Sequence, residues 1–153
     1  MTLMQDLLEK TAEGYWQRLR EVTNLSAKDP LVQEEIRSTM GLSDFIAEQV
    51  ISRPELLNSA LKFEPAEAQY THFFKALSDE LKNCPDEASG HPVIRRFRHQ
   101  LMVAIAWHDL NNKQTIEQSL QQVSDLADAI IKATYHWLYK MLCDKYGIPM
   151  GPK

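Results

Sequence analysis

A basic cluster runs directly into an unbroken apolar block between Ile94 and Leu110. The block contains seven consecutive apolar residues, Leu101–Trp107. At about 3.6 residues per turn, a run of that length covers every side of a helix. A helix that is apolar all round is stable only where other elements surround it. We therefore predict that this segment forms the core helix of a bundle.

The basic residues before the apolar block need anionic neighbours. Pro92 suits the first position of a helix, which would place Arg95, Arg96 and Arg98 in the first two turns. The macrodipole is positive there, so each cation loses about 0.3–1 kcal/mol. Carboxylates of adjacent helices would compensate, and so would a docked anionic partner.

Two pairs of carboxylates are candidates to face these arginines. Asp125 and Asp128 lie three residues apart and share a helix face, and Asp44 with Glu48 is the second pair. We predict that one charged cluster has either a structural or a partner-docking role. Its members are Arg95, Arg96, Arg98, His99, Asp125 and Asp128.

Hydrophobic residues recur at helical spacing along nearly the whole chain, and no segment alternates with the period of two that marks a strand. We predict an all-α fold, a bundle of about six helices with a long C-terminal helix. One helix is expected to start at Asp29-Pro30 and stop at Gly41, and Ser43 is expected to cap the next. The stretch Cys84–Pro92 is expected to be a flexible loop.

The long C-terminal helix is predicted from Ile116 to Tyr146, with Gly147 as its stop. Its packed face is expected to follow steps of three and four residues, typical of a helix packed nearly parallel or antiparallel to its neighbours. The predicted seam consists of Leu120, Val123, Ala127, Ile130, Thr134, Trp137 and Met141.

Length and composition narrow the class of protein. The 153 residues fit one helical domain, predicted to span 1–153. A net charge of −4 and a pI near 5.7 argue against general binding to nucleic acids or membranes. Cys84, Cys143 and the histidines show no metal-ligand spacing. No apolar run could cross a bilayer, and we predict a cytoplasmic protein.

Three segments carry a further pattern. Ile94–Leu110 contains Arg-Phe-Arg followed by Ile-Ala-Trp-His-Asp-Leu, and upstream Ser43-Asp44-Phe45 precedes Arg-Pro-Glu-Leu-Leu at Arg53–Leu57. Downstream, Ser124–Asp128 leads through the long helix to Tyr146–Pro149. These elements, in this order, resemble those of the bacterial glutamine synthetase adenylyltransferases. Three arginines of the family pattern are replaced here, by His99, Ala104 and His108.

The resemblance implies an N-terminal fragment that precedes a nucleotidyltransferase domain absent from this chain. Such a fragment is expected to be a non-catalytic scaffold, inactive alone, of an enzyme that adenylylates and deadenylylates glutamine synthetase in nitrogen regulation. Magnesium ions and ATP are implied for the whole enzyme. The implied partners are the remainder of the parent enzyme, glutamine synthetase and the PII signalling protein, and the arginines would then face an acidic patch or a phosphate. Apolar residues uncovered near Trp137–Met150 would mark the interface with the rest of the enzyme.

No catalytic, cofactor-binding or metal-binding residue is assigned. The family's Asp-x-Asp pair occurs nowhere in this sequence, and Gly41–Phe45 only faintly resembles its Gly-Ser turn. His108-Asp109 has the composition of a general base with its orienting acid, but no nucleophile adjoins it, and a structural role is favoured. The alternative to the enzyme fragment is a free-standing helical protein-protein interaction module.

Overall fold

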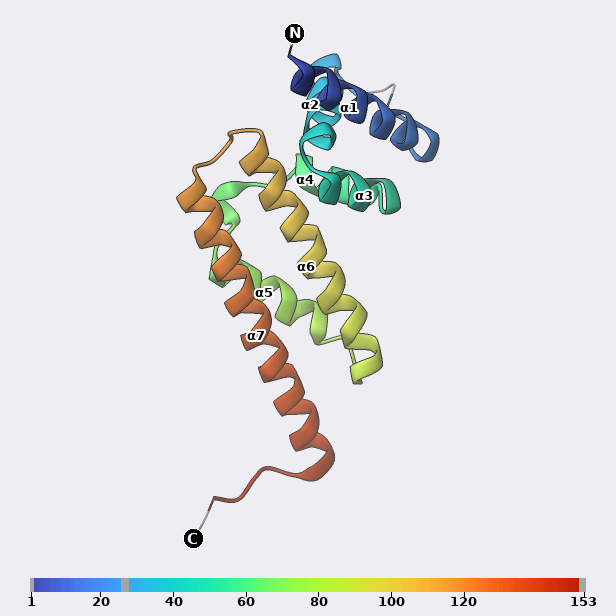
Figure 1. Ribbon diagram of the computed structural model, residues 1–153. Helices are drawn as coiled ribbons and strands as arrows, with labels where there is room; N and C mark the ends of the chain where they lie inside the picture. Colours follow the sequence, from blue (N-terminus) through green and yellow to red (C-terminus); the bar gives the residue numbers. More distant parts are fainter. Residues whose placement is uncertain (1, 26–27, 152–153) are drawn as a thin grey trace. The chain divides into compact units, whose positions relative to one another are not determined.

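A computed structural model describes residues 2–25 and 28–151 (Figure 1). Within these ranges there are seven α-helices, one short 3-10 helix and no strand, so the all-α prediction is confirmed. The seventh helix, with 31 residues, is the predicted long C-terminal helix. The elements are α1 (Leu3–Val22), α2 (Pro30–Leu42), α3 (Asp44–Ser52), α4 (Glu55–Leu61), η1 (Pro65–Glu67), α5 (Tyr70–Leu81), α6 (Glu87–Leu110) and α7 (Ile116–Tyr146). Over the described residues, none of these helices has the length and apolar character needed to span a membrane.

The chain divides into two compact units. The first contains the residues up to Phe63 together with Val103–Ser119. The second contains Glu64–Met102 together with the residues from Leu120 on. Both α6 and α7 therefore contribute residues to each unit.

Capping side chains determine where the helices of the first unit begin. The Asp29 carboxylate accepts a hydrogen bond from the Leu31 backbone N–H at 2.8 Å, with Pro30 as the first residue of α2. The Ser43 hydroxyl accepts from the Ile46 backbone N–H at 3.3 Å and caps α3. Both predicted starts are confirmed, and α2 ends one residue later than expected.

The core of the first unit includes part of the apolar run predicted to be central. Val103, Ala104 and Trp107 of α6 are almost fully buried in one hydrophobic cluster. The other members of this cluster come from α1 to α4 and the loop after α1: Leu19, Leu25, Ile36, Met40, Ile46, Ala47, Val50, Leu56, Leu57 and Ala60. Gly41 permits a close approach of α1 and α2, because a Cβ there would lie 2.7 Å from the Ala12 Cβ.

The second unit is built from α5, the first part of α6 and most of α7. Its buried apolar side chains on these helices are Phe73, Leu77, Leu81, Phe97, Leu126, Ala129 and Ala133. Gly90 of α6 faces the indole of Trp137 on α7, and a Cβ at Gly90 would overlap that ring. The indole N–H of Trp137 also donates to the Cys84 carbonyl at 3.1 Å. Trp137 is thus seated against the start of α6.

The predicted start of α6 at Pro92 is wrong, and of the loop predicted over Cys84–Pro92 only the part before Glu87 lies outside a helix. The helix begins at Glu87, because Asp86 and Ser89 cap each other's backbone N–H groups. Pro92 therefore lies inside the helix, and the arginines fall beyond its first two turns. The macrodipole effect fades within the first turn, so the expected electrostatic penalty does not arise.

The predicted seam of α7 is displaced by one residue in its first half. Leu120, Val123 and Ala127 are exposed, and the buried positions are Ser119, Gln122, Leu126, Ala129 and Ala133. Two of these are polar, and the Ser119 hydroxyl is satisfied by donating to the Asp109 carboxylate at 2.7 Å. A prediction from apolar periodicity alone therefore selects exposed positions that lie next to the buried ones.

The contact between Gly90 and Trp137 can be tested with a matched pair of glycine substitutions. Gly90→Ala should lower the free energy of unfolding by about 1–3 kcal/mol, because the new methyl group must displace a packed indole ring. Gly14→Ala, in an exposed part of α1 with open space around it, should raise it by about 0.5–1 kcal/mol. Urea unfolding measures both, and equal stabilisation by the two substitutions would contradict the packing.

Candidate functional site

The three arginines of the predicted cluster lie on α6, exposed to solvent, with His99 half-buried beside them. Arg96 forms an ion pair with Glu80 of α5, with 2.7 Å between guanidinium nitrogen and carboxylate oxygen. Among the described residues, neither Arg95 nor Arg98 belongs to an ion pair. The structure therefore engages Arg96 within the second unit and leaves the other two side chains in water.

The acidic residues that were candidates to face the arginines have other partners. Asp125 of α7 accepts a hydrogen bond from the Tyr70 backbone N–H at 3.2 Å, at the first residue of α5. Its other oxygen accepts from Gln121 at 2.8 Å. Asp128 is exposed and, within the described part of the chain, in no ion pair. Asp125 thus supplies the cap that α5 lacks from its own N-cap side chain.

The second pair, Asp44 and Glu48, belongs to the first unit. The Tyr15 hydroxyl donates to Asp44 at 2.9 Å. Arg18 forms a two-pronged contact with Glu48, at 2.8 and 3.1 Å. Both carboxylates therefore join α3 to α1, and the guanidinium that the sequence led us to expect from α6 comes from Arg18 instead.

His108 and Asp109 do not act as a pair. The His108 ring is buried, with its Nε2 3.2 Å from the Ala60 carbonyl and a T-shaped contact with the Phe63 ring. Asp109 accepts a hydrogen bond from Ser119 instead. The contacts of His108 are those of a packed structural side chain.

A polar network around Trp107 was not found from the sequence. The Trp107 indole N–H donates to the Glu35 carboxylate at 2.7 Å, and Lys113 donates to the same oxygen at 2.7 Å. Asn111 bonds to Thr39 at 2.8 Å nearby. Burial alone would raise the pKa of Glu35, but the hydrogen bonds from Lys113 and Trp107 outweigh it and lower that pKa. These partners lie more than 70 residues apart, and no local pattern joins them.

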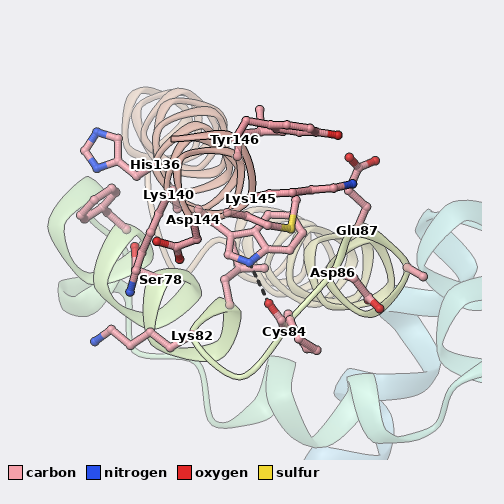
Figure 2. A pocket seen from close by; sticks show the side chains of 18 residues that line it. Ser78, Lys82, Cys84, Asp86, Glu87, His136, Lys140, Asp144, Lys145 and Tyr146 are labelled. Carbon is pink, nitrogen blue, oxygen red and sulfur yellow. Dashed lines mark hydrogen bonds between the residues drawn. The ribbon is translucent and has the colours of Figure 1, made fainter. Parts of the chain in front are cut away.

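The second unit contains a groove with a volume of about 1150 Å³ (Figure 2). It runs between α5, the α5–α6 connection and the C-terminal half of α7, and we call it the α5–α7 groove. Its apolar lining consists of Phe74, Leu81, Pro85, Ala88, Ala133, Trp137, Met141 and Leu142. Its charged rim consists of Lys82, Asp86, Glu87, Lys140, Asp144 and Lys145, which Figure 2 shows around the opening.

A second surface of α7 is apolar and uncovered. Its residues follow one another at steps of three or four, which keeps them on one slowly winding side of the helix. Ile131 is 68% exposed and Tyr135 is 61% exposed. We call this surface the α7 stripe, formed by Leu120, Val123, Ala127, Ile131, Tyr135, Tyr139, Leu142 and Tyr146.

Comparison with known proteins decides the family. The model of the glutamate-ammonia ligase adenylyltransferase family matches residues 33–153. The chain belongs to this family. The chain is 34% identical, over 152 residues, to a bifunctional glutamine synthetase adenylyltransferase/adenylyl-removing enzyme of Shewanella oneidensis. It is 38% identical over 143 residues to the enzyme of the same name from Vibrio parahaemolyticus.

These adenylyltransferase relatives are far longer than the chain. The alignments cover 96% and 93% of this chain, but only 16% and 15% of the Shewanella oneidensis and Vibrio parahaemolyticus enzymes. The family resemblance inferred from the three sequence segments is therefore confirmed. In the part of this adenylyltransferase-family chain that the structure describes, no three His, Cys, Asp or Glu side chains gather as metal ligands would.

The Glu35 network predicts an acid-dependent contribution to stability. A carboxyl group whose pKa is lowered by folding stabilises the fold above its unfolded pKa, and this stabilisation is lost as the pH falls through the folded pKa. Glu35→Gln should lower the free energy of unfolding by about 1–2 kcal/mol at pH 7, and by less near pH 3. Urea unfolding at several pH values measures this difference, with Glu34→Gln, on the exposed neighbouring residue, as the control. A loss that is independent of pH would contradict the assignment.

The arginine cluster predicts unequal effects on stability. Arg96→Ala should lower the free energy of unfolding by about 0.2–1 kcal/mol, the range for an exposed ion pair. Arg98→Ala should change it by less than about 0.5 kcal/mol, because that side chain is exposed and outside any ion pair of the described residues. Matched urea titrations compare the two, and a larger loss for Arg98→Ala would show a structural role that the geometry does not contain.

Proposed function

We propose that this chain is the N-terminal helical region of a bifunctional glutamine synthetase adenylyltransferase/adenylyl-removing enzyme, and that it serves as a non-catalytic scaffold for the rest of that enzyme. The single observation that carries the scaffold role is the α7 stripe, an uncovered apolar surface on the longest helix. Family membership and the length of the relatives support the assignment to a larger enzyme.

The α7 stripe has the character of an interface. An isolated exposed leucine is ordinary, but a continuous apolar surface along one helix marks a contact site. Tyr135 and Tyr139 stack on each other within it, with 6.1 Å between ring centroids. Aromatic side chains with a polar tip are enriched at protein interfaces. In this proposal the remainder of the enzyme covers the stripe and is held in place by it.

The chemistry belongs, in this proposal, to the remainder of the enzyme. Metal-dependent nucleotidyl transfer needs closely spaced carboxylates, and this chain contains no Asp-x-Asp pair. Magnesium ions and ATP are therefore assigned to the remainder, and this region is expected to be inactive alone. The cytoplasmic location expected from the sequence stays a prediction.

Glutamine synthetase and the PII protein are proposed as further partners of the complete enzyme. Arg95 and Arg98 are the side chains of this region best suited to contact an acidic surface of either, because both are exposed and outside the ion pairs of the described residues. Arg96 is less suited, because Glu80 already neutralises it.

A segment exchange tests the proposal. This chain would replace the matching segment of the Vibrio parahaemolyticus enzyme, which we call the exchanged enzyme, and both activities toward glutamine synthetase would be assayed. The exchanged enzyme should keep both within about threefold, whereas deletion of the segment should abolish both. The isolated chain should neither attach nor release adenylate. Activity of the isolated chain, or a folded but inactive exchanged enzyme, would overturn the proposal in favour of another role, such as a free-standing interaction module.

The α7 stripe can be tested within the exchanged enzyme. Ile131→Glu should lower both activities together by about tenfold, because it places a charge in the covered surface. Lys132→Glu, on the adjacent exposed position, is the matched control and should have little effect. In the isolated chain both substitutions should change stability by less than about 0.5 kcal/mol. Equal activity of the two variants would contradict a scaffold interface at the stripe.

A further inference from the structure

The α5–α7 groove extends the packed face of α7 beyond the part that its neighbours cover. Along the first part of α7 this face is buried at Leu126, Ala129 and Ala133. At helical spacing the same face continues through Trp137 and Met141, which are only half-buried and line the groove. A helix face that is packed over several turns and then opens into a hollow lacks one neighbour there.

The size of the groove favours a polypeptide over a small molecule. One turn of helix, taken as a cylinder about 10 Å wide and 5.4 Å long, occupies roughly 420 Å³. The groove volume of about 1150 Å³ exceeds the volume of one such turn. Pockets for small ligands are typically about 300–1,000 Å³ and enclose most of the ligand.

The charges on the rim favour an occupant with both signs of charge. The lysines at the rim are Lys82, Lys140 and Lys145, and they are matched in number by the carboxylates Asp86, Glu87 and Asp144. A nucleotide or another polyanion would meet three of these carboxylates, which argues against it. An amphipathic helix could place its apolar face on the apolar lining of the groove. Charged residues of both signs beside that face could then pair with the lysines and carboxylates of the rim.

The floor of the groove is held in place before anything binds. The Trp137 indole is held by its hydrogen bond to the Cys84 carbonyl (Figure 2). It also packs closely against Gly90, where a Cβ would overlap the ring. A preformed floor reduces the ordering that binding would otherwise require. The floor of the groove is therefore preformed.

We propose that the α5–α7 groove holds an amphipathic helix from the remainder of the parent enzyme. This inference rests on the proposed function and names a second contact within it, on a face of α7 that meets the α7 stripe at Leu142 and Tyr146. The chain leaves α7 at Gly147, directly after Lys145 and Tyr146, which line the groove. A segment tethered there reaches the groove at high effective concentration, which favours it over a helix of a separate protein or a second copy.

Site-specific photo-crosslinking in the exchanged enzyme tests the groove. The photoreactive residue p-benzoylphenylalanine would replace Lys140 at the rim, or Ala76 on an exposed part of α5 outside the groove lining as the control. Mass spectrometry should find position 140 joined to one peptide of the same polypeptide outside the 153 residues, at about ten times the yield from position 76. Adding Met141→Glu should abolish this crosslink by placing a charge on the groove floor.

The outcomes separate the two proposals. An active exchanged enzyme that gives no crosslink at position 140, or one only to glutamine synthetase, to a second copy or to solvent-exposed peptides at control yield, overturns the groove assignment and leaves the scaffold proposal standing. A folded exchanged enzyme without activity overturns the scaffold proposal itself. Retention of the crosslink in the Met141→Glu variant also overturns the groove assignment, because the floor would then be irrelevant to the contact.

Discussion

The burial of Trp107 is the interaction on which the first unit depends. The core of this unit is formed by α1 to α4 together with α6, and α6 supplies its largest side chain. The Trp107 indole N–H would be an unsatisfied donor there without the Glu35 carboxylate, and Glu35 would be an unpaired charge without Lys113. The packing of the core and the hydrogen bonding of its polar groups therefore depend on the same residues, Trp107, Glu35 and Lys113.

Helix α6 also explains why the chain has two compact units without a conventional linker. Phe97 is buried in the second unit, and a turn and a half further on Val103 enters the core of the first. The apolar run from Leu101 onward is thus the end of a helix that serves both units. Removing this helix would leave each unit without a core element, so neither is a simple module that can be cut away.

The parts of this fold that the sequence predicts are those with local causes. Asp29 with Pro30, and Ser43, start helices through contacts two or three residues away, and Gly147 ends α7 with a positive φ of 87°. The start of α6 was predicted at the wrong residue because Pro92 is a strong signal for a helix start. The cap that Asp86 and Ser89 form is a weaker signal in the sequence. The packed face of α7 was predicted at the wrong residues because a buried position can be polar when its polar group is hydrogen-bonded. Ser119, which donates to Asp109, is such a position.

The candidate site is harder to read because its determinants are not local. Arg96 pairs with Glu80 across two helices, and Asp125 caps a helix that starts 55 residues earlier. No spacing rule within one helix selects such partners, because they depend on which faces meet after packing. The sequence predicts an uncovered apolar surface only near the C-terminal end of α7. The rest of the α7 stripe could not be predicted, because the exposure of a residue depends on which elements pack against its helix.

The exposed α7 stripe has little effect on the stability of the chain alone, but it can stabilise a contact with another part of a longer polypeptide. The stripe residues add little to the stability of the second unit while water surrounds them, yet fully burying one such side chain contributes about 1.5–3 kcal/mol. Two separate proteins would first lose translational and rotational freedom, which absorbs several such contributions. Segments of one polypeptide avoid most of that loss, so partial covering of the stripe and the groove would suffice to fix a neighbouring domain. The same surfaces would bind a separate partner only if it buried most of both, and this difference in required area is the physical reason to favour the scaffold over the free-standing module.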